Sequence, residues 1–242
     1  SGWPIFRVVG WWAAFLVLTI AGERLELSRF LPTFRAARAV FVSAVGLFAA
    51  GLVLACAAFD MGARLSGLGL LVLSFWLLRH DIARRAVQKA GLTRFVAVSL
   101  LSGYLWLGVA GLLGLRFGGL AAGLHYDAWL HAIFLGFVFA MIFGHAPIIF
   151  PAVLGVPVPF RSAFYAHLAV LHVSLVLRVS GDLAAWWPGR QWGGLLNVVA
   201  VLLFLGNTAR AVVEGRGWQG PAARPGHAES RCESEVLQEG AS

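Results

Sequence analysis

Residues 128–154 read AWLHAIFLGFVFAMIFGHAPIIFPAVL and contain no Asp, Glu, Lys or Arg. A helix needs about 20 consecutive apolar residues to cross the hydrocarbon core of a bilayer. Continuous apolar runs indicate helices, whereas barrel strands show alternating segments of roughly 10 residues. This stretch therefore predicts a transmembrane helix that carries two histidines, His131 and His145, inside the membrane.

The rest of the chain repeats this pattern. Of its 242 residues, 60% are hydrophobic and 12% are charged, whereas soluble domains carry about 25% charged residues. Six further apolar runs span roughly 3–22, 37–58, 64–79, 94–116, 160–180 and 192–213. We therefore predict an all-α, polytopic transmembrane bundle of about seven helices at 1–216. Residues 217–242 are rich in Gly, Pro, Ala, Glu and Ser, which predicts a disordered polar cytoplasmic tail.

The basic residues predict how the bundle is oriented, because Lys and Arg concentrate in cytoplasmic loops. One side of the membrane collects Arg24, Arg29, Arg35, Arg38, Arg79, Arg84, Arg85, Lys89, Arg94, Arg161, Arg210, Arg216, Arg224 and Arg231. The other side collects Arg7, Arg64, Arg116, Arg178 and Arg190. The N-terminus is therefore predicted outside and the C-terminus in the cytoplasm.

Charge, cysteines and motifs exclude several functional classes. The net charge is +8, but the basic residues separate apolar runs, so we expect anionic lipid headgroups as partners and no nucleic acid. Cys56 lies in an apolar run and Cys232 in the tail, which implies no disulfide framework. The chain has no Walker loop, GxSxG elbow or HExxH motif, so nucleotide and soluble hydrolase chemistry is not expected.

Two groups of polar residues lie at predicted cytoplasmic helix ends. The first run closes with Glu23, Arg24 and Glu26. The expected role is an interfacial salt-bridge cluster that contributes little free energy; a helix end docking on a cofactor edge is the functional alternative. Residues 79–91, RHDIARRAVQKAG, predict an ordinary basic loop in which Asp81 is solvated.

Small and aromatic residues indicate how the helices pack and where they end. Gly114 and Gly118 form a small-xxx-small pair in the fourth helix, which we interpret as tight packing within the bundle. Trp186, Trp187 and Trp192 are typical of the aromatic belt at the outer membrane interface.

Histidines concentrate in one region. Five of the seven lie between residues 125 and 182, namely His125, His131, His145, His167 and His172. Ionisable groups inside a membrane are expensive and mark functional sites by default. On an ideal α-helix His131 and His145 fall within about 40° of one face, about 21 Å apart along the axis. We therefore expect a bundle-facing stripe that also holds Leu135, Val138 and Ile142.

The sixth helix runs back antiparallel and brings its own histidines to the fifth. If the chain reverses near residue 157, His145, His167 and His172 lie at similar depth. Neutral imidazole is the commonest metal ligand and an axial ligand of haem iron. His145 with His167 or His172 is therefore a candidate metal or haem site, and Arg178 a partner for a haem propionate or for Asp182. The alternative is that these histidines join helix to helix or line a proton path.

The stretches WLHAIFLGFVFAMIFGHAP and HLAVLHVSLVLRVSGD resemble the later half of the NnrS-type family, which is distantly similar to the haem–copper oxidase catalytic subunit. The matching positions are His131, Gly136, Gly144, His145 and Arg178. The resemblance implies a multi-pass protein of the bacterial inner membrane that binds haem b or copper. It also implies a link to nitric oxide metabolism during denitrification.

Three functional hypotheses follow. The first is a haem- or copper-binding redox protein with cofactor ligands among His131, His145, His167 and His172, assisted by Arg178. The second is a cofactor-free membrane subunit or assembly factor of a larger respiratory oxidoreductase complex. The third is a small transporter, ranked last because the proline-interrupted fifth run has no matching break elsewhere. The chain offers too few histidines for a complete terminal-oxidase centre.

Overall fold

The computed structural model describes residues 2–28, 34–155 and 158–217, and every regular element in these parts of the chain is a helix. The elements are α1 (Ile5–Ser28), α2 (Phe34–Ala57), α3 (Phe59–His80), α4 (Ala83–Ala86), α5 (Gly91–Phe117), α6 (Leu124–Leu130), η1 (His131–Phe139), α7 (Ala140–Leu154), α8 (Phe164–Leu183) and α9 (Trp187–Gly217). Seven helical segments of the described residues are long and apolar enough to cross a membrane. The predicted all-α bundle of seven spans is confirmed. The predicted tail lies outside the described residues except for Gly217, the last residue of α9.

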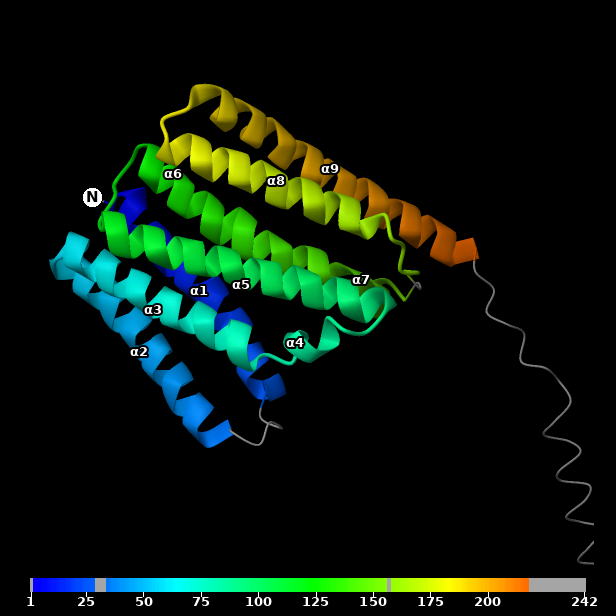
Figure 1. Cartoon of the computed structure of the whole chain (residues 1–242), viewed down its shortest axis with the longest axis horizontal. Coiled ribbons are helices and arrows are strands. Elements are labelled where there is room, and N and C mark those ends of the chain that lie inside the picture. Colours follow the sequence, from blue (N-terminus) through cyan, green and yellow to red (C-terminus); the bar gives the residue numbers. More distant parts are fainter. Residues whose placement is uncertain (1, 29–33, 156–157, 218–242) are drawn as a thin grey trace, which may run out of the picture.

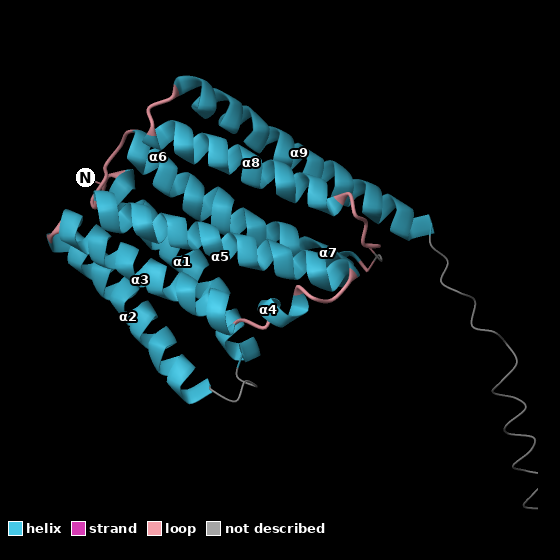
Figure 2. Ribbon diagram, viewed as in Figure 1, coloured by secondary structure: helices cyan, strands magenta, loops and turns pink. Residues whose placement is uncertain are grey.

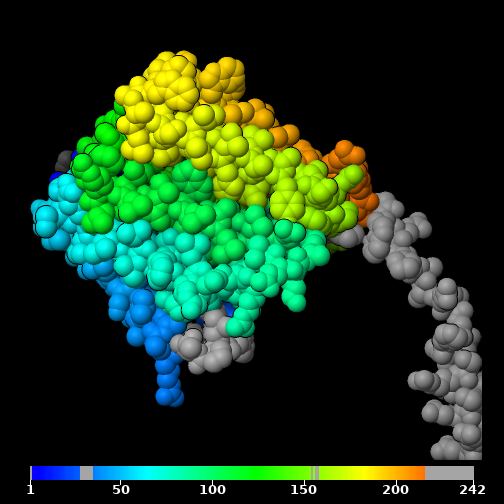
Figure 3. Space-filling model, viewed as in Figure 1, coloured from blue at the N-terminus to red at the C-terminus, as the bar shows by residue number. Residues whose placement is uncertain are grey.

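The helices form an up-and-down bundle with two hairpins at its edges. Figures 1 and 2 show α2 and α3 along one edge, α8 and α9 along the other, and α5 and the α6–η1–α7 segment between them. Figure 3 shows the same order crossing one face of the molecule. We call the end that holds the start of α1 the outer end, and the opposite one the inner end, after the predicted orientation. That orientation stays a prediction.

Large apolar side chains point away from the bundle on its outer helices. On α9, Leu195, Leu202 and Leu205 are all more than half exposed. In water such a surface would be unstable, so lipid is the solvent that these helices suit. The exposed Trp186, Trp187 and Trp192 lie at the α8–α9 turn, the outer end of the bundle. This is the location that an interfacial aromatic belt requires.

Two helices begin five residues earlier than their apolar runs predicted. The third run was expected at 64–79, but α3 begins at Phe59. Asp60 lies in its first turn and binds Arg64 one turn later, with 2.8 Å between Oδ2 and Nε. A carboxylate suits the positive end of the helix dipole there. Helix α9 likewise begins at Trp187 rather than 192.

Glycines set the distance between α3 and α5. A Cβ atom on Gly67 would lie 2.4 Å from the Leu115 nitrogen, and one on Gly111 would lie 2.6 Å from the Leu71 nitrogen. Because these neighbours are backbone atoms, they cannot move aside cheaply. Gly114 meets Gly67 at the same contact, so its expected role in tight packing within the bundle is confirmed.

The inner connection between α3 and α5 is ordered by a buried carboxylate. Asp81 is 4% exposed, so the expectation that it is solvated is wrong. One carboxylate oxygen accepts a hydrogen bond from the Ala83 nitrogen at 2.7 Å, and the other accepts one from the Tyr104 hydroxyl at 2.7 Å. The burial of Asp81 could not be predicted from the sequence, because the Tyr104 hydroxyl comes from the middle of another transmembrane helix.

We expect Gly67→Ala to loosen the α3–α5 contact and lower the free energy of unfolding by about 1–3 kcal/mol, the usual cost of overpacking. The matched control is Gly46→Ala, because no atom lies within 4 Å of a Cβ placed there. Titration with denaturing detergent measures the difference. Equal stability of the two variants would contradict the contact.

We expect Tyr104→Phe to leave Asp81 short of one donor and to cost about 1–3 kcal/mol of stability, the penalty for an unsatisfied buried polar group. Tyr165→Phe is the control, because its ring packs against Phe95 and Phe160 and its hydroxyl has no hydrogen bond within the described part of the chain. The same unfolding assay reports both. A Tyr104→Phe protein as stable as the control would show that the hydroxyl does not hold this connection.

Candidate functional site

Four charged side chains meet at the outer end of α6, α8 and α9. Asp127 contacts Arg178 at 3.4 Å and Arg190 at 3.0 Å through the same carboxylate oxygen. Asp182 lies 3.3 Å from Arg178 and 2.6 Å from Arg190, and its side chain is 0% exposed. Two arginines therefore face two aspartates, and the cluster carries no formal net charge. Its compensation makes a buried set of charges tolerable in a membrane.

Close contact of α8 and α9 brings this cluster together. A Cβ atom on Gly193 would lie 2.6 Å from the Arg178 nitrogen, and one on Gly181 would lie 2.7 Å from the Arg190 nitrogen. Gly193 of α9 thus lies against the backbone of Arg178, and Gly181 of α8 lies against the backbone of Arg190. Farther along, the Ser174 hydroxyl donates to Asn197 Oδ1 at 2.5 Å. Polar contacts therefore follow the α8–α9 interface into the membrane.

Arg178 was a candidate partner for a haem propionate or for Asp182. The structure gives it Asp182 and, in addition, Asp127. Its Nη1 also donates to the Arg190 carbonyl at 3.2 Å. With two carboxylates already bound, Arg178 has no free charge for a propionate. The spacing of four residues between Arg178 and Asp182 was visible in the sequence, but the arrival of Arg190 depends on the α8–α9 turn.

His131 lies next to this cluster and has one ring nitrogen free. Its Nδ1 lies 2.7 Å from the Asp127 carbonyl oxygen, and a carbonyl only accepts, so Nδ1 carries the proton. Its Nε2 then presents a lone pair, with no hydrogen-bond partner among the described residues. A histidine whose other nitrogen is held by a carbonyl is oriented as metal-ligating histidines are.

His145 is hydrogen-bonded to Arg24, which lies near the start of the sequence. Its Nδ1 lies 2.7 Å from the Met141 carbonyl and its Nε2 lies 3.3 Å from Nη2 of Arg24. A guanidinium only donates, so the Nε2 lone pair is already engaged. Arg24 is 8% exposed and lies 3.9 Å from Glu23. The expectation of a purely interfacial cluster at this helix end is therefore wrong for Arg24, which enters the bundle.

His167 and His172 have the opposite tautomer. Trp106 donates its indole N–H to His172 Nδ1 at 3.1 Å, and indole nitrogen only donates. Asn207 places its amide nitrogen 3.3 Å from His167 Nδ1, while the same nitrogen donates to the Ala163 carbonyl at 3.1 Å. In both rings Nδ1 accepts, so Nε2 carries the proton. Both Nε2 atoms are buried and have no hydrogen-bond partner among the described residues.

The three histidines proposed as a metal set are not gathered around one centre. His145 faces α1, whereas Phe143 on the same helix packs against the His167 ring with 4.8 Å between centroids. Side chains two positions apart on an α-helix point roughly 200° apart, so His145 and His167 lie on opposite sides of α7. Within the described residues, no group of three or more His, Cys, Asp or Glu side chains can hold a metal ion.

The expected shared face of His131 and His145 is also wrong. Residues His131–Phe139 form a π-helix, η1, whose hydrogen bonds run from i to i+5 rather than i+4. The angle of 100° per residue therefore does not apply between the two histidines. Ile142, which was assigned to the bundle-facing stripe, is 42% exposed. Stretches of π-helix frequently occur at functional sites, and this one starts at His131.

We expect Asp182→Asn to destabilise the bundle by about 3–5 kcal/mol, because two partly buried arginines then share one carboxylate. The control is Glu214→Gln, which removes a more exposed carboxylate that also binds two arginines, Arg161 and Arg210. Its loss should cost about 0–1 kcal/mol. Comparable losses in the two variants, measured by unfolding in detergent, would contradict the importance of burial.

Comparison with known proteins supports a family assignment for nearly the whole bundle. The family model described as "Domain of unknown function (DUF8744)" matches residues 1–213. This match covers all seven spans almost to the end of α9. No curated protein and no solved structure matches the chain. The chain therefore belongs to the DUF8744 family.

Proposed function

We propose that this protein binds haem b through His131 in a multi-pass membrane bundle. The observation that carries the proposal is the geometry of Asp127. Its carbonyl oxygen accepts the Nδ1 proton of His131, while its carboxylate contacts both Arg178 and Arg190. A hydrogen-bonded, oriented imidazole with a free Nε2 is what a metal requires of a ligand.

The same geometry favours haem over copper. Porphyrin supplies four of the iron's ligands, so one imidazole is enough to hold a haem. Copper would need further protein ligands, and the described residues offer no such group. A haem held by His131 would supply an iron that binds a small diatomic ligand. The resemblance to NnrS-type proteins supports nitric oxide as that ligand and the bacterial inner membrane as the location.

The charge cluster next to His131 is electrostatically compatible with a haem ligated by this histidine. Because two arginines and two aspartates compensate one another, the cluster presents no net charge to a metal centre. The Asp127 carboxylate contacts both arginines, which restrains the backbone of Asp127 and therefore the carbonyl that binds His131. The chain's own contribution would be to orient the imidazole and to keep its tautomer fixed.

His145, His167 and His172 do not fit as ligands in their present arrangement. The lone pair of His145 is engaged by Arg24, and the buried Nε2 atoms of His167 and His172 carry protons. Ligation through His145 Nε2 would displace Arg24, and ligation through Nε2 of His167 or His172 would require that nitrogen to lose its proton. We therefore assign these three histidines to contacts between helices.

Three of the four candidate histidines bind partners from other helices, and this observation favours a second candidate function. In that case the chain is a cofactor-free membrane subunit of a larger respiratory oxidoreductase. His131 would then be a fourth structural histidine whose Nε2 faces the partner. Purification in a fixed ratio with an oxidoreductase, without pigment, would favour this function.

We expect protein reconstituted with haem b to show a Soret band that His131→Ala loses, because the axial ligand is gone. The control is His125→Ala on the same segment, where the ring packs 4.0 Å from the Phe117 ring. Absorption spectra and pyridine haemochrome analysis give the haem-to-protein ratio. A Soret band of equal intensity in the His131→Ala protein, or none in the wild type, would overturn the proposal.

A further inference from the structure

A pocket at the outer end is lined by none of the four candidate histidines. It is lined by residues of α1, α2, α3, α5 and α6. Small-molecule sites are mostly apolar with a few polar groups. Here the walls are aromatic and aliphatic, with Phe48, Leu52 and Trp129 among them.

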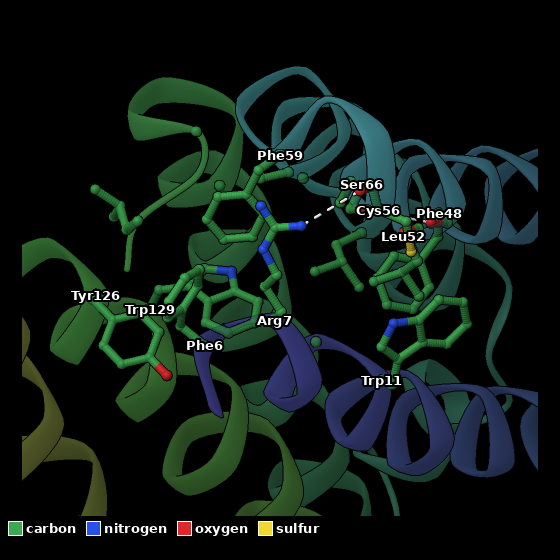
Figure 4. Close-up of a pocket in the computed structure, with 18 of the residues that line it drawn as sticks. Phe6, Arg7, Trp11, Phe48, Leu52, Cys56, Phe59, Ser66, Tyr126 and Trp129 are labelled. Carbon is green, nitrogen blue, oxygen red and sulfur yellow. Dashed lines mark hydrogen bonds between the residues drawn. The ribbon is translucent and has the colours of Figure 1, made fainter. Parts of the chain in front are cut away.

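Arg7 supplies the pocket with a positive charge. Figure 4 shows its side chain beside the Phe59 ring, with Trp11 and Phe48 farther along the pocket. Its Nη1 donates to the Cys56 carbonyl at 3.4 Å, and its guanidinium carbon lies 5.6 Å from the centre of the Phe59 ring. Both contacts are weak and neither neutralises the charge.

Three of the other four outer arginines pair with carboxylates, whereas Arg116 packs on the Phe117 ring. Arg64 pairs with Asp60, and Arg178 and Arg190 share two aspartates. Among the described residues Arg7 has no carboxylate partner. An unneutralised guanidinium on an apolar wall inside a membrane favours an anion as its neighbour.

The bilayer is the expected source of the anion, because the side of the pocket at α1 is exposed. Trp3 and Trp11, both lining residues, are 59% and 43% exposed, and α1 forms one wall. Indole side chains of this kind lie at the level of lipid headgroups. An acyl chain would enter between aromatic walls while its headgroup stays at the interface near Arg7.

We propose that this pocket binds an anionic phospholipid, with its phosphate at Arg7 and one acyl chain among the aromatic side chains. The ligand that fits the pocket is therefore an amphiphile with an anionic headgroup. An arginine–phosphate contact is charge-assisted, and the apolar chain gains from leaving neighbouring lipid only through close packing. Charge should therefore decide which lipid is retained.

Native mass spectrometry of the full chain in detergent tests this. The protein is incubated with equal amounts of phosphatidylglycerol and phosphatidylcholine that have identical acyl chains. We expect one bound lipid, with phosphatidylglycerol preferred by about tenfold, which corresponds to 1.4 kcal/mol. Arg7→Gln should abolish the preference and Arg7→Lys should keep most of it.

Arg116→Gln is the matched control, because Arg116 is an outer arginine that packs on the Phe117 ring and does not line the pocket. It should retain phosphatidylglycerol as the wild type does. An unchanged preference in Arg7→Gln, or equal retention of both lipids by the wild type, would overturn the proposal. A co-purified fatty acid that Arg7→Gln loses would instead place a carboxylate at Arg7 and overturn the phospholipid assignment.

A second variant guards against a folding defect in Arg7→Gln. Ala63 lines the pocket, and Ala63→Phe should fill it without changing any charge. We expect a folded Ala63→Phe protein, eluting as the wild type does in gel filtration, to bind less than a tenth of the lipid, a loss of more than about 1.4 kcal/mol. Undiminished binding by that protein would place the lipid elsewhere and overturn the proposal.

Discussion

Hydrocarbon offers no hydrogen-bond partners, so every polar group that a helix carries into the membrane must find its partner within the protein. Several polar side chains meet this constraint through contacts with another helix. Arg24 of α1 reaches His145 of α7, Trp106 of α5 reaches His172 of α8, and Asn207 of α9 reaches His167. The arginines and aspartates at the outer end do the same with charges. These contacts determine which helices lie next to one another, which apolar packing alone would determine poorly.

Short distances between helices make these pairings possible. Glycines at the α3–α5 and α8–α9 contacts bring backbone against backbone, so short side chains such as Ser174 can reach across. The sequence predicts part of this. The seven spans could be counted because each is a long apolar run with few charges, and Gly114 could be assigned to packing from its spacing. Which helix lies against which could not be read, since lipid-facing and bundle-facing residues are equally apolar.

The candidate site was harder to predict for a related reason. The concentration of histidines on the fifth and sixth spans was evident, but the direction of each ring depends on local helix geometry. A π-helical stretch after His131 changes the face on which His145 lies, and no apolar pattern announces it. Arg24 is separated from His145 by 121 residues, so only the packing of α1 against the bundle could reveal their contact. Asp81 was misassigned for the same reason, since its donor lies on another helix.

Partner atoms that can only donate or only accept fix the tautomers of His131, His145, His167 and His172. Nitrogen-15 NMR of histidine-labelled protein in bilayers measures this directly, because protonated and bare ring nitrogens differ widely in chemical shift. We expect a proton on Nδ1 in His131 and His145 and on Nε2 in His167 and His172. A proton on Nε2 of His145, or on Nδ1 of His172, would mean that the contacts with Arg24 or Trp106 do not exist in the membrane.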